Sequence, residues 1–446
     1  MTQLFDILII GAGPAGLAAA HAAAVAAPGA RVGVVDDNPM SGGQIWRGGA
    51  DKQPDRRASE LWSALQAAPN VSFMHQHRVL YAPAAGQLLV QSPAAAAVLN
   101  YQRLIIATGA RELLLPFPGW TLPGVCGAGG LQALAKGGYP VAGKRVVVAG
   151  SGPLLLAVAA TLTERGAQVV AIAEQAATPQ LARFALGLLA TPSKIKQGLQ
   201  LWTALRGIPY YRDSYVTAAS SGTAMHGAAH AAPAGSVSGS IAGMDCLRSV
   251  TLRRHGAGTQ IIACDYLACG YGLVPNPELA MSLGCAVTPA TQAVQTDTWQ
   301  QTTVPGIYCA GEGTGVGGVD KALAEGRIAG LAAAGRQDLA LPHISTRSRW
   351  QGFARRLARA FTLRAEIRAL ANDGSVVCRC EDVCHGELRQ HDSWRSAKLH
   401  TRCGMGPCQG RICGSATATL YGWRPESVRV PITPARVDSI IHSDPT

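Results

Sequence analysis

The chain contains two copies of one local pattern, a short apolar strand followed by a glycine-rich loop and an alanine-rich helix. In the first copy, residues 4–10 (LFDILII) lead into GAGPAG, and a second strand is expected at 31–36. In the second copy, residues 144–149 (KRVVVA) lead into GSGPLL, and the next strand ends at Glu174. A buried strand that ends at glycine and continues as a helix builds a β-α-β unit. Two such units predict an α/β fold with two dinucleotide-binding domains on doubly wound, mostly parallel sheets.

The first glycine loop has the complete dinucleotide-binding fingerprint. We expect Gly11 to make the tight turn, Gly13 to let the backbone approach a pyrophosphate, and Gly16 to let the helix pack closely on the sheet. The helix N-terminus at Pro14–Ala15 would face the phosphates. Asp36 ends the second strand 25 residues after Gly11, where its carboxylate can accept hydrogen bonds from ribose hydroxyls. This loop therefore predicts a bound nicotinamide or flavin dinucleotide.

The second glycine loop keeps two of the three glycines. Gly150 and Gly152 are followed by Pro153, but Leu155 stands at the third position and is expected to hold the helix slightly off its strand. Glu174 suits a ribose 2′-hydroxyl and would repel a 2′-phosphate, which favours NAD over NADP. Two alternatives stay open: the loop binds NAD or an adenine nucleotide, or the duplicated fold persists as a scaffold without one.

The 12 cysteines are unevenly distributed, and six of them lie between residues 378 and 413. No Cys-x-x-Cys occurs, although disulfide reductases need such a pair of thiols. Clustered thiols without that motif indicate a metal or cluster site, and free thiols are typical of a reducing, cytoplasmic compartment.

Two close pairs of cysteines are the candidate metal ligands. Cys378 and Cys380 are one residue apart, and Cys403 and Cys408 are separated by four. Zinc ligands usually stand in pairs two residues apart, so this spacing favours a 2Fe-2S cluster over zinc or a decayed site. Cys384 and Cys413 are alternative ligands, but the simpler expectation is that they are neighbouring buried thiols.

A basic segment separates the main body from the cysteine-rich part. Seven arginines and one acid lie between residues 347 and 368, and Trp350, Phe353, Leu357 and Phe361 recur there at helical spacing. The net charge of +12 allows nucleic acid, an anionic membrane face or acidic partners. Because the arginines accompany apolar anchors, we expect a helical arm that docks partner subunits rather than a nucleic-acid site.

Several stretches resemble a known group of flavoproteins. GAGPAG, GGQIWR (42–47), ATGA (107–110) and GIYCAGE (306–312) look like successive signatures of the two-dinucleotide-domain flavoproteins. Over nearly its whole length the chain resembles the FAD-containing large subunits (the A type) of multi-subunit amine dehydrogenases: the A subunits of opine oxidases, the middle subunit of hydrogen cyanide synthase, and the FAD/NAD(P)-binding subunit of D-hydroxyproline dehydrogenase. The residues around VVCRCEDV and RCGMGPCQGRICG resemble bacterioferritin-associated ferredoxin.

The resemblance implies where the cofactors bind. FAD would be held by the first glycine loop and by Gly43, Gln44, Arg47, Val79, Thr108, Gly109, Gly311 and Glu312. The family ends its last strand in Gly-Asp, so Glu312 reaches one methylene further towards a ribityl hydroxyl. The implied domains are an FAD-binding domain (1–118 and 290–344), a second dinucleotide domain (119–289), a basic helical linker arm (345–372), and a 2Fe-2S domain with a tail (373–446).

The function implied by the resemblance is electron relay. A sister subunit resembling amino-acid oxidases would oxidise a secondary amine or amino acid of the opine, hydroxyproline, proline or glycine type. This chain would pass the electrons through FAD and the cluster to an acceptor such as a quinone, with a small ferredoxin-like subunit as a further partner. Such a complex would be cytoplasmic, and the resemblance also allows association with the inner face of the cell membrane.

Two other functions stay open at this point. A free-standing NADH-dependent flavin and iron-sulfur reductase would use an intact nicotinamide site at Gly150, and a scaffold or nucleic-acid-binding protein would use the positive charge. His75, His77 and His230 are isolated candidates for a general base, but lone histidines are more often structural. We expect no transmembrane span, since residues 7–27 are apolar but contain the first glycine loop.

Overall fold

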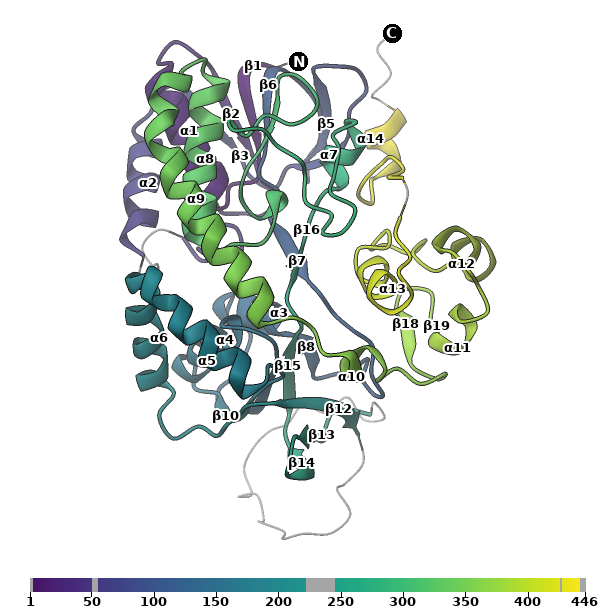
Figure 1. Cartoon of the computed structure of the whole chain (residues 1–446). Helices are drawn as coiled ribbons and strands as arrows, with labels where there is room; N and C mark the ends of the chain where they lie inside the picture. Colours follow the sequence, from purple (N-terminus) through teal and green to yellow (C-terminus); the bar gives the residue numbers. More distant parts are fainter. Residues whose placement is uncertain (1–2, 50–54, 222–244, 426, 442–446) are drawn as a thin grey trace.

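The computed structural model describes residues 3–49, 55–221, 245–425 and 427–441 (Figure 1). Its first domain is built on a seven-stranded sheet in the order β3-β2-β1-β6-β5-β4, with β17 paired to β6. The strands β3, β2, β1, the end of β6 and β17 run parallel, whereas β4 and β5 extend the sheet in antiparallel fashion. The bounds are β1 Gln3–Ile10, β2 Val32–Val35, β3 Val71–Met74, β4 Arg78–Tyr81, β5 Gln87–Gln91, β6 Ala96–Ile106 and β17 Ile307–Cys309.

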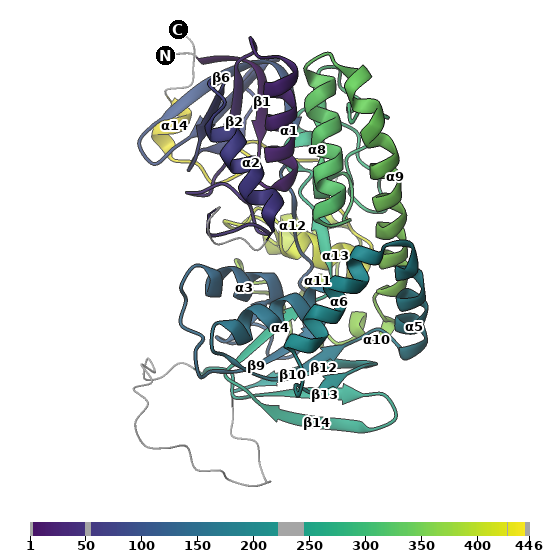
Figure 2. The same ribbon diagram turned by 90° about the vertical axis from the view of Figure 1, so that its left-hand side faces the viewer.

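Two helices of the first domain touch through their backbones. A Cβ atom on Gly326 of α8 (Val319–Ala333) would lie 2.2 Å from the carbonyl oxygen of Ala15 in α1 (Pro14–Ala26), and one on Gly330 would lie 2.2 Å from that of Ala19. Glycines four residues apart line up on one helix face. This contact places the middle of α8 beside the start of α1, and Figure 2 shows the two helices side by side.

The second domain repeats the parallel architecture. Its main sheet has the order β11-β10-β9-β15-β8, and a three-stranded antiparallel sheet β12-β13-β14 lies beside it. The short strands β7 (Ala110–Glu112) and β16 (Leu273–Pro275) pair with each other and connect the domains. The bounds are β8 Val125–Gly127, β9 Arg145–Gly150, β10 Gln168–Glu174, β11 Tyr210–Tyr211, β12 Ser214–Ser220, β13 Ser249–Arg254, β14 Gly258–Ala263 and β15 Tyr266–Gly270, with helices α3 Ala128–Lys136, α4 Leu154–Glu164, α5 Thr178–Gly187 and α6 Pro192–Ala204.

The segment that contains α7 packs against the first sheet. Residues 276–289 were expected in the second domain, but Leu279 and Cys285, in and just after α7 (Glu278–Ser282), pack in one apolar cluster with Phe5 and Ile10 of the first sheet. Strands β7 and β16 therefore stand in the chain between the parts that form the two sheets. Of residues 216–245, which we expected to be a loop or hairpin, 222–244 lie outside the described residues.

The basic segment is helical, but it is not a free arm. Helix α9 (Gln337–Ala360) begins before the expected boundary at 345 and runs along α8 towards the second domain (Figure 2). Trp350 and Phe353 are buried, and the Phe353 ring lies 6.1 Å from that of Phe184 on α5. The apolar face of this helix is thus used within the chain.

The C-terminal module has a small core of its own. Val377, Leu388, Trp394 and Cys403 are buried together in it. Its elements are β18 Val376–Cys378, β19 Val383–Cys384, α11 His385–Leu388, α12 Trp394–Thr401 and α13 Cys413–Tyr421. None of the helices in the described ranges combines the length and the apolar character that a membrane span requires.

The segment after α13 returns to the first domain. The Ile432 amide donates to the Leu80 carbonyl at 2.8 Å, and the Thr433 hydroxyl donates to the Val79 carbonyl at 3.1 Å. The chain then forms α14 (Val437–Ile441) beside the first sheet (Figure 1). The cysteine-containing module is therefore attached to the rest of the molecule on both sides.

Candidate functional site

Two glycines of the first loop are required by the fold, and the third leaves space for a ligand. A Cβ atom on Gly11, whose φ is +106°, would lie 2.3 Å from the Ala107 carbonyl oxygen. One on Gly16 would lie 1.8 Å from the Gly11 carbonyl oxygen, so both positions require glycine for folding. Gly13 has an extended backbone, and a Cβ atom there would come no closer than 3.9 Å to the Gly43 Cα atom. Only Gly13 therefore leaves its face clear for the close approach of a ligand.

Asp36 is held against this loop. Its side chain is 7% exposed, and its Oδ2 atom accepts a hydrogen bond from the Ala12 amide at 2.5 Å. Its Oδ1 atom accepts from the amide and the side chain of Asn38, both at 2.8 Å. The carboxylate thus stands at the end of β2 beside the helix N-terminus, as the fingerprint requires.

The structure brings the GGQIWR stretch onto the same loop. A Cβ atom on Gly43 would lie 3.0 Å from the Gly13 Cα atom. The Arg47 guanidinium donates to Asn38 Oδ1 at 3.2 Å and to Gln44 Oε1 at 3.1 Å. Asn38 therefore links Asp36 to Arg47, a role that no sequence motif indicated.

Other expected FAD contacts lie on β4 and in the connection between β6 and β7. Val79 in β4 packs in the same apolar cluster as Val35 of β2. The Thr108 hydroxyl donates to the Asn276 carbonyl at 2.9 Å, and the Asn276 side-chain amide donates to the Thr108 carbonyl at 2.9 Å. Asn276 thereby fixes the segment around Gly109, which has a φ of +69°.

Glu312 is bound by the chain's own backbone. Its two carboxylate oxygens accept from the amides of Gly317 at 3.0 Å and Gly318 at 2.7 Å, just before α8. Burial raises the pKa of this carboxyl above its usual value. A ribityl hydroxyl would therefore share a carboxylate that already receives two hydrogen bonds.

A buried ion pair beneath Gly311 was missed at the sequence level. The Lys321 ammonium donates to the Gly311 carbonyl at 2.9 Å, and Glu325 Oε2 accepts from the Gly311 amide at 3.0 Å. Both side chains are nearly inaccessible. Their i, i+4 spacing on α8 was the available signal, but such pairs are usually exposed.

The second glycine loop has the same connection to its acidic residue. Glu174 Oε2 accepts from the Gly152 amide at 2.7 Å, and its Oε1 accepts from the Ala176 amide at 2.8 Å. Burial raises the pKa of Glu174 to about 7. Gly150 is required by the fold, because a Cβ atom there would lie 1.8 Å from the Gly270 carbonyl oxygen. Pro153 precedes α4, and the core accommodates Leu155.

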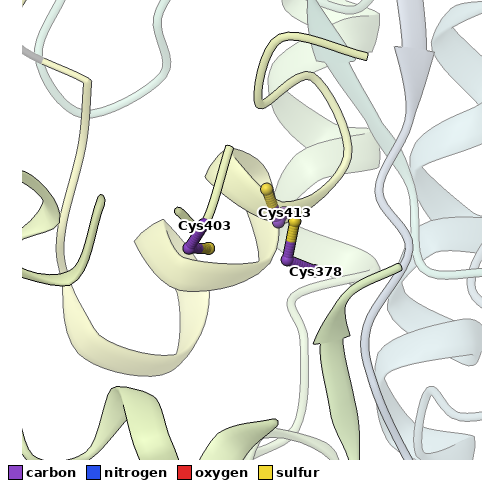
Figure 3. A group of neighbouring side chains, drawn as sticks. All are labelled: Cys378, Cys403 and Cys413. Carbon is purple, nitrogen blue, oxygen red and sulfur yellow. The ribbon is translucent and has the colours of Figure 1, made fainter. Parts of the chain in front are cut away.

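Three cysteines of the C-terminal module converge. The Sγ atoms of Cys378 at the end of β18, Cys403 after α12 and Cys413 at the start of α13 lie within 4.8 Å of one another (Figure 3). Electrostatic interactions also connect Cys408 with Cys413 and with Cys380, so five thiols form one group of neighbours. The first turn of α13 directs Cys413 into the group, so it stays an alternative ligand beside the four cysteines that the spacing predicts.

Cys384 lies apart from this group. Its sulfur contacts the backbone carbonyls of Gly374 at 3.8 Å and Asp382 at 3.9 Å. The structure therefore separates the two cysteines whose roles the sequence left open.

The backbone around the thiols fits an anionic cluster. The Gly404 amide points at Cys378 Sγ from 3.5 Å, and the amides of Gly410 and Ile412 donate to Cys408. Hydrogen bonds from neighbouring thiols lower the pKa of Cys378 to about 2 and contribute to lowering that of Cys408 to about 5. Cysteine sulfurs that receive such amide hydrogen bonds are suited to hold a metal ion or an iron-sulfur cluster.

Glycine is needed where the chain passes this group. Gly404 and Gly410 have φ values of +80° and +76°, and a Cβ atom on Gly406 would lie 2.3 Å from the Cys380 Cβ atom. A side chain at position 404 or 410 would meet the Trp394 ring, and one at position 406 would push against Cys380, so this stretch packs tightly only with glycine.

Arg111 joins the two candidate cofactor regions. It lies in β7, two residues after Gly109, and its Nε atom donates to the Arg411 carbonyl at 2.9 Å. Arg411 stands between Cys408 and Cys413 in the chain. The Arg111 Nη1 atom also donates to Asn276 Oδ1 at 2.8 Å and pairs with Glu278 at 2.7 Å. One side chain therefore contacts both the Thr108–Gly109 region and the cysteine loop.

The isolated histidines have structural contacts. His75 is hydrogen-bonded to the Ser41 hydroxyl at 2.8 Å, and His77 to the His75 carbonyl at 2.7 Å. His230 lies outside the described residues.

Comparisons with known proteins agree with this arrangement. Residues 5–192 and 235–336 match the pyridine nucleotide-disulphide oxidoreductase family. The chain is 30% identical to the A subunit of opine oxidase from Agrobacterium tumefaciens (strain Ach5), over 99% of this chain and 92% of that protein. It is also 30% identical to hydrogen cyanide synthase subunit HcnB of Pseudomonas protegens, over 91% and 89% of the two chains. The fold is similar to that of L-proline dehydrogenase from P. horikoshii, with a TM-score of 0.66 at 16% identity over 98% of this chain and 80% of that one.

Proposed function

The chain belongs to the pyridine nucleotide-disulphide oxidoreductase family and to the family of the opine oxidase A subunits, and we propose that it relays electrons within a multi-subunit, acceptor-linked dehydrogenase. The donor is a secondary amine or amino acid with a CH-NH or CH-NH2 group, which a sister flavoprotein subunit resembling amino-acid oxidases oxidises. The acceptor is a quinone or a similar carrier, and a small ferredoxin-like subunit completes the assembly. The complex is cytoplasmic or attached to the inner face of the cell membrane.

Two cofactors carry the electrons in this proposal. FAD, which can take up two electrons and release them singly, is held by the first glycine loop, with Asp36 at its ribose and Thr108–Gly109 further along. A 2Fe-2S cluster is held by the cysteine group. The protein orients both, and the N-terminus of α1 compensates the phosphate charge.

The contact of Arg111 with Arg411 is the observation that carries the proposal. It couples the segment after the FAD strand β6 to the loop between two cluster cysteines. The Trp120 indole adds a second attachment, since it donates to the Val376 carbonyl at 2.6 Å just before Cys378. A module that served only for stability would not need its thiols beside the flavin-binding segment.

The experiment starts with the full-length purified chain. We expect a flavin absorption band, iron and acid-labile sulfide, and an electron paramagnetic resonance signal of the reduced cluster. Co-expression with a candidate amine-oxidising subunit should yield a complex in which the amine reduces both centres. A preparation without flavin and iron would refute the proposal.

A variant of the connecting arginine tests the relay itself. Arg111→Leu should retain flavin and iron but slow the reduction of the cluster after the flavin has been reduced in the complex. Arg389→Ala is the matched control, because Arg389 is an exposed arginine of the cysteine-containing module that pairs with Asp373 at 3.0 Å. Equal rates in both variants and in the wild type would contradict a role for Arg111.

A further inference from the structure

We propose that the second glycine loop is closed by the chain's own segment 361–364, called the strap below, and that it seats this segment instead of binding a nucleotide. The strap follows α9 directly and leads into the cysteine-containing module. This inference rests on contacts in the second domain alone and does not depend on the proposed electron relay.

Hydrogen bonds hold the strap on the loop. The Ser151 hydroxyl, between the two loop glycines, donates to the Phe361 carbonyl at 3.3 Å. The Gln175 side-chain amide donates to the Thr362 carbonyl at 3.1 Å and to the Ser151 hydroxyl at 2.9 Å. The Arg364 amide donates to Gln175 Oε1 at 3.1 Å. Gln175 is fully buried, and both the nitrogen and the oxygen of its side-chain amide form hydrogen bonds with the strap.

The Phe361 side chain covers the position where a pyrophosphate would approach. A Cβ atom on Gly152 would lie 3.8 Å from Phe361 Cγ. The Phe361 ring makes an edge contact with the ring of Phe184 on α5, with centroids 5.1 Å apart. In a dinucleotide fold the second glycine lets the backbone approach the phosphates. At Gly152 this space is taken by an aromatic ring of the same chain.

The ribose position is covered as well. Gln175 follows Glu174, whose carboxylate would bind ribose hydroxyls in an NAD-binding fold. The Arg364 guanidinium donates to the Gln175 carbonyl at 3.3 Å and pairs with Asp213. The strap therefore crosses the loop from the phosphate position to the ribose position. Its last residue, Arg364, is held by the ion pair with Asp213.

The first loop differs at the equivalent point. The neighbour of Gly13 is the Cα atom of Gly43, a residue without a side chain, whereas the neighbour of Gly152 is an aromatic ring. In both domains the acid accepts a hydrogen bond from the loop backbone, from the Ala12 amide in the first loop and from the Gly152 amide, one position further along, in the second. The duplicated folds thus share their architecture but differ in the group that faces the second glycine.

Seating the strap also fixes the segment that comes after it. Ile367 is 1% exposed and packs with Tyr215 and Val250 of the second domain. The chain enters the cysteine-containing module at Val376. The second dinucleotide fold therefore acts as an anchor that orients this module.

Nucleotide binding to the full-length, flavin-loaded chain tests the proposal, with NADH and ATP as the probes. Binding is followed by NADH fluorescence and by equilibrium dialysis of ATP. We expect no binding to the wild type, and saturable binding to the double variant Phe361→Gly/Arg364→Ala, in which the ring and the ion pair are removed. Arg359→Ala is the matched control, because this exposed arginine lies on α9 just before the strap.

Hydrogen exchange of a peptide spanning residues 361–364 shows whether the strap has been released. Exchange should be slow in the wild type and in Arg359→Ala, and fast in the double variant. Binding of NADH or ATP to the wild type would overturn the proposal, as would fast exchange of the strap there. A double variant with a released strap that still fails to bind either nucleotide would also overturn it, because the strap would not be what closes the loop.

Discussion

The ammonium of Lys321 lies 2.8 Å from Glu325 Oε2, one turn further along α8, in an interior where the two residues are only 3% and 1% exposed. Removing one partner of a buried pair leaves an uncompensated charge. Lys321→Met should therefore lower the free energy of unfolding by about 3–5 kcal/mol, measured by urea denaturation.

Two further variants test whether the loss of stability comes from leaving one buried charge without its partner. The double variant Lys321→Met/Glu325→Leu should recover most of the stability, because no buried charge is left behind. Arg336→Ala breaks an exposed pair with Asp338 and should leave the unfolding transition unchanged. If the Lys321→Met variant were as stable as the wild type, the Glu325 side chain would have to be protonated, and thus uncharged, in the variant.

The glycines of the first loop should separate folding from flavin binding. Gly13→Ala adds a methyl group that meets no atom closer than 3.9 Å, so the chain should fold normally. The methyl group would still stand where the pyrophosphate approaches, and FAD binding should weaken by about 1–3 kcal/mol. Flavin content and thermal unfolding of the apoprotein measure the two effects.

Gly16→Ala should act on the fold itself. Its Cβ atom would lie 1.8 Å from the Gly11 carbonyl oxygen, so α1 must shift, at a cost of about 1–3 kcal/mol or more. Gly29→Ala is the control, since nothing lies within 4 Å of a Cβ atom there. A Gly13→Ala protein with full flavin content would show that the cofactor does not approach this loop.

Substitution of single cysteines should define the cluster ligands. We expect Cys378→Ser and Cys413→Ser to lose iron, because both sulfurs lie in the converging group. Cys384→Ser should keep its iron, because its sulfur contacts only backbone carbonyls. Iron and acid-labile sulfide per chain are the measurements.

The comparison of Cys403 with Cys413 is the sharpest part of that series. A 2Fe-2S cluster needs four ligands, and five thiols are contiguous. If Cys403→Ser keeps its iron and Cys413→Ser loses it, Cys413 is a ligand and Cys403 is not. The reverse result would support the ligand set expected from spacing, which contains Cys403.

Glu174 should make stability depend on pH. Burial raises its pKa from 4.5 to about 7, so the folded chain holds this proton more tightly than the unfolded chain does. The free energy of unfolding should then fall as the pH rises from about 4.5 to 7, by up to about 3 kcal/mol from this group. In Glu174→Gln this part of the pH dependence should be absent. Thermal unfolding of both proteins from pH 5 to 8 measures the difference, and parallel curves would contradict the assignment.

Local signals in the sequence were sufficient for the two dinucleotide folds. A strand, a glycine loop and a helix follow one another within some 25 residues, so Gly11, Asp36, Gly150 and Glu174 could be placed from spacing alone. The FAD-binding, domain-boundary and ligand assignments that rest on resemblance stay predictions.

Long-range contacts were beyond the reach of the sequence. Ser151 meets Phe361 across 210 positions, and the helical spacing of Phe361 indicated only an apolar face without naming what covers it. Spacing pairs Cys413 with Cys408, whereas in the structure its sulfur lies within 4.8 Å of the sulfurs of Cys378 and Cys403. Sequence spacing relates residues that are close along the chain, whereas the fold determines which residues are close in space.

The return of the chain to β4 has a mechanical consequence for the cysteine-containing module. The strap ties the entrance of the module to the second domain, and Ile432 and Thr433 tie its exit to the first. A ferredoxin on a loose tether carries charge by swinging between donor and acceptor. A module that is attached on both sides stays at a fixed distance from the flavin-binding domain. In the proposed relay, electrons would therefore tunnel over a distance that the fold sets, and the rate would not depend on diffusion of the module.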